Sequence, residues 1–80
     1  MTVTWDVMHA EALFVSDLQP SDHPSAREVQ VEVMTAILRH GVDGCADLLA
    51  QEYGEHHEQA AQRMRWCLDT VADAYQPAAV

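Results

Sequence analysis

Hydrophobic residues recur along most of the chain at the three- and four-residue spacing of an α-helix. The last third shows the pattern most clearly, in a stripe of Ala60, Met64, Cys67, Leu68, Val71 and Tyr75. The strongest strand signal is the alternation over residues 29–33, but it lies between a helix start and a helix stop. The pattern therefore predicts an all-α chain, a small bundle of four helices at about 5–18, 26–40, 44–53 and 57–75.

Capping residues set the expected helix boundaries. Ser25 and Glu28 have the spacing of a capping box, which predicts the start of the second helix. Gly41 is expected to end that helix, and Asp43 to be the N-cap of the third. Gly54 is expected to end the third helix, so a fourth helix follows it.

The length of the chain predicts one domain. Eighty residues are too few for two cores, so residues 1–75 are expected to form a single helical domain. Pro20 and Pro24 indicate a linker over residues 19–24, because each restricts the residue before it. Pro77 is expected to stop the last helix and to leave a flexible C-terminal tail at residues 76–80.

The second helix is apolar on two sides. One stripe contains Val29, Val33, Ala36, Ile37 and His40, and a second contains Val31, Met34 and Leu38. A helix that is apolar over so much of its circumference is expected to be central, or to have one face in a subunit interface. A chain this short also buries a limited core, which favours a homodimer.

The net charge of −9 narrows the choice of partners. All four basic side chains are arginines, against thirteen carboxylates, so nucleic acid and anionic membrane surfaces are disfavoured. A basic protein, or a neutral one that docks on apolar side chains, fits better. The chain shows no signal peptide and no apolar run of transmembrane length, so we expect a cytoplasmic protein with reduced cysteines.

A helix-turn-helix pattern gives an alternative function. Residues 45–68 are expected to form a helix, a glycine turn at Gly54 and a second amphipathic helix, which resembles the DNA-binding unit of repressors and sigma factors. Glu55 stands where that motif has an apolar residue, and further acidic residues surround it. A helical hairpin within a bundle explains the same pattern, and a DNA-binding or sigma-type regulator remains the second hypothesis.

The chemistry-bearing residues do not form a recognisable catalytic or metal-binding motif. His56 and His57 are weak metal candidates, but no CxxC, HxxxH or HExxH spacing accompanies them, so no metal or cofactor is expected. The chain has no phosphate-binding glycine loop and no nucleophile elbow, which favours a protein that is not an enzyme. Cys45 and Cys67 are expected to be buried thiols, and the pattern leaves open whether they approach each other.

An aromatic and basic cluster lies off the apolar stripe of the last helix. It consists of Gln62, Arg63, Arg65 and Trp66, and a tryptophan beside arginine is typical of a protein-binding hot spot. We therefore predict that these four residues bind a partner. The alternative is that another element, such as the N-terminal helix with Trp5, covers the tryptophan.

Several segments resemble small uncharacterised proteins from Streptomyces and related actinobacteria. They are residues 12–22 (ALFVSDLQPSD), 44–46 (GCA), 51–54 (QEYG) and 63–66 (RMRW), and the likeness extends from about residue 9 to 75. The resemblance implies a cytosolic actinobacterial protein with a regulatory or accessory role, and it assigns no functional residue. The aromatic and basic cluster, the acidic charge and the short chain lead us to predict a small acidic protein–protein interaction module that is homodimeric.

Overall fold

The computed structural model describes the backbone of residues 3–75 and the side chains of residues 7–75. Its elements are α1 (Val3–Phe14), a short 3-10 helix η1 (Pro20–Asp22), α2 (Ala26–Glu55) and α3 (His57–Ala74). No strand occurs within residues 3–75, so the prediction of an all-α fold is confirmed. The predicted tail at 76–80 lies outside the described residues.

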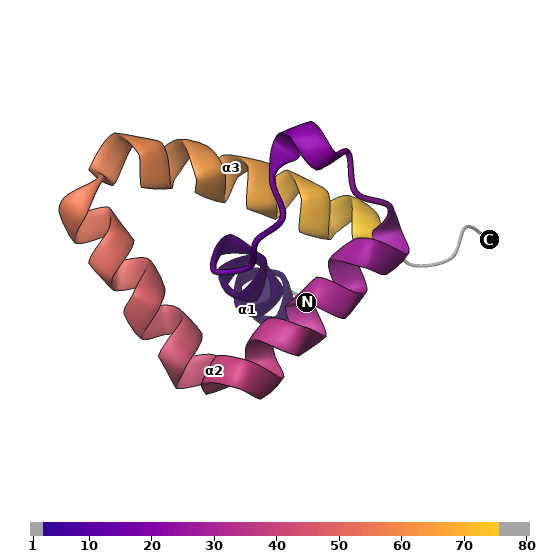
Figure 1. Ribbon diagram of the computed structural model, residues 1–80, viewed down its shortest axis with the longest axis horizontal. Coiled ribbons are helices and arrows are strands. Elements are labelled where there is room, and N and C mark those ends of the chain that lie inside the picture. Colours follow the sequence, from indigo (N-terminus) through magenta and orange to yellow (C-terminus); the bar gives the residue numbers. More distant parts are fainter. Residues whose placement is uncertain (1–2, 76–80) are drawn as a thin grey trace.

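The bent helix α2 and the straight helix α3 form the sides of a triangle, and α1 passes through the middle of it (Figure 1). Each of the three helices contacts the other two. Because α1 is surrounded, the small residues Ala10 and Ala12 and the larger Leu13 are all fully buried. The centre of the core is therefore α1. Burial of the Leu13 side chain alone contributes about 1.5–3 kcal/mol to stability.

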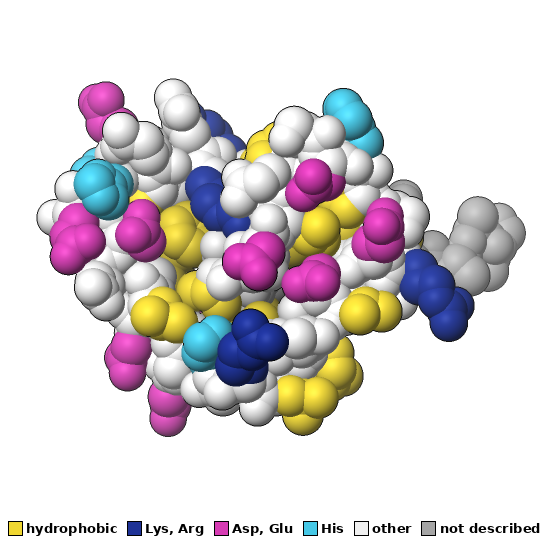
Figure 2. All heavy atoms as spheres, viewed as in Figure 1, with side chains coloured by type: hydrophobic (Ala, Val, Ile, Leu, Met, Phe, Trp, Pro, Cys, Tyr) yellow, Lys and Arg dark blue, Asp and Glu magenta, His cyan; other side chains and the backbone are white. Residues whose placement is uncertain are grey.

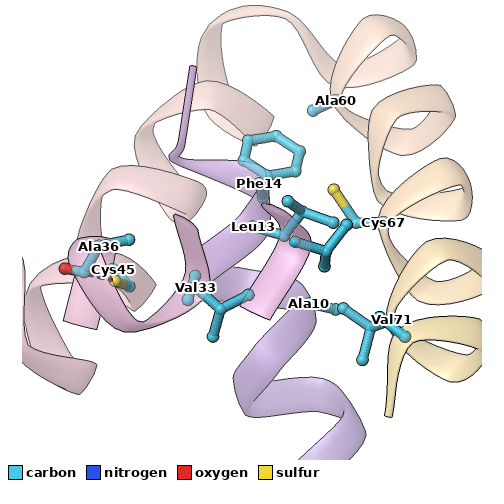
Figure 3. Close-up of a cluster of buried hydrophobic side chains, with 12 residues drawn as sticks. Ala10, Leu13, Phe14, Val33, Ala36, Cys45, Ala60, Cys67 and Val71 are labelled. Carbon is cyan, nitrogen blue, oxygen red and sulfur yellow. Dashed lines mark hydrogen bonds between the residues drawn. The ribbon is translucent and has the colours of Figure 1, made fainter. Parts of the chain in front are cut away.

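The core draws on all three helices. Its buried members are Ala10, Ala12, Leu13, Phe14, Val29, Val33, Ala36, Cys45, Ala60, Cys67, Val71 and Ala74. Figure 3 shows Leu13 and Phe14 of α1 between the side chains of α3 and those of α2. The predicted stripe of the last helix supplies Ala60, Cys67 and Val71, whereas Leu68 of the same stripe remains 40% exposed.

The prediction of four helices was wrong, because residues 26–40 and 44–53 belong to one kinked helix. Gly41 interrupts α2 with φ 73° and ψ 164°, and the helix continues to Glu55. The backbone at Gly41 is not helical, so two helical arms meet there at a kink, and they pack on different sides of α1 (Figure 1). Asp43 lies inside α2 and is not an N-cap, and Gly54 lies one residue before the end of the helix.

The predicted start of α2 is confirmed by a capping box. The Ser25 Oγ accepts a hydrogen bond from the Glu28 amide at 3.1 Å, and the Glu28 carboxylate accepts one from the Ser25 amide at 2.8 Å. The short helix η1 in the 19–24 linker was not predicted, and the Asp22 carboxylate holds its start by accepting a hydrogen bond from the Gln19 amide at 2.8 Å. Among the described residues, no helix combines the length and the apolar character needed to cross a membrane.

The first helix is shorter than predicted at its C-terminal end. It stops at Phe14 and not at Leu18, and the Ser16 hydroxyl donates to the Leu13 carbonyl at 2.6 Å just past the stop. The last turn of α1 contains no basic residue that could interact with the free carbonyl groups. A side chain from α3 interacts with these carbonyl groups instead.

Candidate functional site

Arg63 of α3 binds the C-terminal end of α1. Its guanidinium donates to four backbone carbonyl oxygens: Phe14 at 2.8 Å from Nε, and Leu18 at 2.9 Å, Ser16 at 3.0 Å and Leu13 at 3.3 Å from Nη2. The last carbonyls of a helix have no partner within the helix and carry partial negative charge. The planar, five-donor guanidinium suits such a set of acceptors, so Arg63 acts as a cap delivered from another helix.

The guanidinium also lies near two aromatic rings. The Cζ atom of Arg63 is 5.6 Å from the centroid of the Phe14 ring and 5.5 Å from that of the Trp66 ring. Trp66 is partly buried and packs against the core. Within the same chain, Arg63 therefore covers part of the Trp66 side chain. The side chain of Trp5, the alternative cover, is outside the described part of the chain.

The four residues predicted to bind a partner are thus divided. Arg63 and Trp66 lie together beside the end of α1, with Arg63 held by intramolecular hydrogen bonds. Gln62 and Arg65 are exposed on α3. Partner binding by these residues stays a prediction, but any partner that reaches Arg63 meets a guanidinium whose Nε and Nη2 donors are already engaged.

A pocket opens next to Arg63. It has a volume of about 340 Å³ and is lined by Phe14, Val15, Leu48, Gln51, Glu52 and Arg63. We call it the α1–α2 pocket, because it lies where the end of α1 meets the second arm of α2. Phe14 is also stacked on Tyr53, with 6.2 Å between the ring centroids, so its ring is held from the α2 side. The lining of the pocket is half apolar (Phe14, Val15 and Leu48) and half polar (Gln51, Glu52 and Arg63). Polar groups beside an apolar surface can orient a ligand in such a site.

The lining of the α1–α2 pocket includes one acidic and one basic side chain, those of Glu52 and Arg63, and Glu55 lies near Glu52. Ligand atoms of Glu52, Glu55 and His56 lie within 4.8 Å of one another. In Figure 2, acidic side chains (magenta) stand around hollows in which hydrophobic side chains (yellow) are visible. The two carboxylates favour a basic ligand group beside an apolar one.

The metal candidates are separated by the structure. His56 belongs to the cluster with Glu52 and Glu55, all three exposed, whereas His57 packs edge-on against Tyr53 at 5.7 Å between centroids. Exposed acidic groups are common without a metal ion, so this cluster does not by itself identify a metal site.

The two cysteines are buried and do not form a disulfide. Cys45 donates from Sγ to the Ala36 carbonyl at 3.8 Å on the α2 side, and Cys67 faces α1 from α3, so α1 lies between them (Figure 3). Burial raises the pKa of the Cys67 thiol to about 12, although the nearby Arg63 lowers it in part. The pKa of Cys45 is raised as well, by burial and then by the charge of Glu11. Both thiols are therefore protonated near neutral pH, which makes them poor nucleophiles.

The apolar lining of the pocket could not be predicted from the sequence. Val15 and Leu48 were not singled out, because nothing in their local pattern separates them from ordinary core positions. Only the bend at Gly41 and the early end of α1 bring Val15 next to Leu48. Comparisons with protein-family models, with curated proteins and with solved structures found no match.

Proposed function

We propose that the protein is a small acidic protein–protein interaction module, and that the α1–α2 pocket is its anchor site. The observation that carries the proposal is the combination of an apolar floor, formed by Phe14, Val15 and Leu48, with the carboxylate of Glu52 at the rim. An apolar side chain buried in a central pocket, surrounded by polar contacts, is the usual form of an interface hot spot.

The proposed ligand is a basic amphipathic helix of another protein. The net charge of −9 attracts such a segment from a distance and repels acidic ones. One large apolar side chain of the ligand enters the pocket, and a lysine or arginine one helical turn away pairs with Glu52 or Glu55. Arg63 forms one wall and keeps the end of α1 in place. A cytoplasmic, regulatory or accessory role, which the resemblance implies, is part of this proposal.

The helix-turn-helix alternative is less well supported. The second arm of α2 and α3 would be the DNA-binding pair, but Arg63 is engaged by carbonyl groups of α1. The exposed surface of α3 then offers Arg65 among Glu58, Asp69 and Asp73. Phosphate binding gains its affinity from several cationic contacts, and this surface carries a net negative charge.

A peptide titration tests the proposed function. The probe is a short fluorescent helix of leucine and lysine with one central phenylalanine, and the control peptide has glutamate in place of lysine. We expect binding of the lysine peptide only, and Leu48→Gln should weaken it about tenfold, which corresponds to about 1.4 kcal/mol.

Leu68→Gln is the matched control, because Leu68 is 40% exposed on α3 and Leu48 is 38% exposed on α2. Equal affinities of the two variants would show that the peptide binds the acidic surface without using the pocket, and the proposed site would be wrong.

A further inference from the structure

The first arm of α2 is apolar on two opposite faces. Val29, Val33 and Ala36 are buried against α1. At 100° per residue, the side chains of Val31, Met34 and Leu38 point about 170° away from them. These three residues, which we call the outer strip, are 54%, 56% and 78% exposed. Figure 2 shows hydrophobic side chains protruding from the lower right, over the first arm of α2.

The outer strip is comparable in area to the largest apolar patch on many monomers. Its exposed apolar area is on the order of 300 Å², which is in the range of the largest patch on a typical monomer, and such patches are often functional. Two shallow hollows adjoin it. One of about 420 Å³ is lined by Arg27, Gln30, Val31, Met34 and Thr35, and one of about 280 Å³ by Leu18, Arg27, Glu28, Val31 and Glu32. Val31 therefore lies between two hollows, and Leu38 protrudes about two helical turns away.

We propose that the outer strip is the interface of a homodimer, in which the first arms of two α2 helices pack antiparallel. The two-fold axis passes near Met34 and Thr35. In this register Leu38 of one copy lies opposite Val31 of the other, above a hollow that can receive it. The contact is made twice, because a two-fold axis repeats every contact.

The charges beside the outer strip favour the antiparallel arrangement. One flank of the outer strip is charged. An α-helix turns by 100° per residue, which places Glu28, Glu32 and Arg39 on this flank. A two-fold axis between antiparallel helices places this flank against the same flank of the other copy. With Leu38 opposite Val31, the partner subunit's Arg39 comes between Glu28 and Glu32. A parallel pair would place this flank against the other one, so these opposite charges would not meet.

The size of the contact predicts a weak dimer. The arm from Ala26 to His40 is about 22 Å long at 1.5 Å per residue, and it ends at the bend of Gly41. One helix pair of that length falls at the low end of specific interfaces, so we expect a dissociation constant on the order of 10 µM.

Sedimentation velocity over a concentration range of about 1 µM to about 500 µM tests the dimer. The unmodified protein should change from monomer to dimer, and Leu38→Glu should raise the dissociation constant by at least about thirtyfold, which is the size of a hot-spot effect. Leu68→Glu, which adds the same charge on α3, should dimerise like the unmodified protein. A protein that stays monomeric throughout, or a Leu38→Glu variant that still dimerises, would overturn the proposal.

Disulfide trapping tests the direction of the helices. A mixture of the Val31→Cys and Leu38→Cys variants should oxidise to a mixed disulfide dimer, whereas each variant alone should form little dimer. Self-linked dimers of each variant without the mixed product would contradict the antiparallel geometry.

The interface is separate from the α1–α2 pocket, because Leu48 is on the other arm of α2. Leu38→Glu should therefore leave binding of the lysine peptide unchanged, and Leu48→Gln should leave dimerisation unchanged. Failure of one proposal is thus distinguishable from failure of the other.

Discussion

The Nε atom of Arg63 in α3 donates a hydrogen bond to the carbonyl oxygen of Phe14 in α1, at 2.8 Å. The contact joins residues 49 positions apart in the sequence and attaches the end of the central helix to α3. A similar contact occurs at the other end of α3, where the Gln30 side chain of α2 donates to the Ala74 carbonyl at 2.7 Å. Side chains from neighbouring helices thus bind two helix C-termini in this fold.

Replacement of Arg63 should destabilise the protein. In Arg63→Ala, the carbonyl groups of Phe14, Ser16 and Leu18 lose their donor, whereas that of Leu13 keeps the Ser16 hydroxyl. We expect the free energy of unfolding to fall by about 2 kcal/mol. Arg65→Ala is the control, since Arg65 is exposed on the same helix and its loss should cost less than about 0.5 kcal/mol. Urea denaturation followed by circular dichroism measures both. Similar values for the two variants would contradict the capping role of Arg63.

The bend in α2 should depend on glycine at position 41. An added Cβ at Gly41 meets no atom within 4 Å, so any cost of Gly41→Ala comes from φ at +73°. Such backbone strain costs about 1–3 kcal/mol in a residue other than glycine.

Gly54→Ala is the matched comparison for this effect. The space at Gly54 is equally open, but the backbone there is helical, so the alanine should stabilise the protein by about 0.5 kcal/mol. Thermal unfolding of the two variants should therefore shift in opposite directions. A stabilising effect of Gly41→Ala would show that the helix is straight in solution.

Burial of Cys67 predicts a loss of stability at alkaline pH. Its pKa is raised from 9.0 to about 12, so between these values the folded protein retains a proton that the unfolded chain has released. The folded state binds more protons there, and the free energy of unfolding falls as pH rises, by about 1.4 kcal/mol per pH unit for one group. Cys45 and Tyr75 act in the same direction, because burial raises their pKa values too.

The Cys67→Ala variant isolates this contribution. Its free energy of unfolding should decline less steeply between pH 9 and pH 11 than that of the unmodified protein, when both are measured by urea denaturation. Identical slopes would mean that the Cys67 thiol ionises as readily in the folded protein as in the unfolded chain.

Local patterns in the sequence predicted the features that depend on neighbouring residues. The stripe of the last helix predicted α3 to within a residue, and the pair Ser25 and Glu28 predicted the start of α2. The second stripe of residues 26–40 indicated either a central helix or an interface, and its residues Val31, Met34 and Leu38 are exposed in the single chain.

Features that depend on distant residues could not be predicted in this way. Arg63 ends α1 at Phe14 through contacts across 45 to 50 positions, and its helical spacing gave no sign of that role. Gly41 was recognised as an interruption, but whether a glycine ends a helix or bends it depends on where the following arm packs. The α1–α2 pocket results from the end of α1 at Phe14 and from the kink at Gly41. The sequence around Val15 and Leu48 therefore could not indicate that these residues line a pocket.

The proposed function requires that the α1–α2 pocket, and not the acidic surface as a whole, receives a partner. Its most direct test is a titration of ¹⁵N-labelled protein with the lysine peptide, monitored by amide chemical shifts. We expect the largest shifts at Val15, Leu48 and Gln51, and their loss in Leu48→Gln but not in Leu68→Gln. Shifts spread evenly over the exposed acidic residues, including Asp69 and Asp73 on α3, would contradict the proposed function.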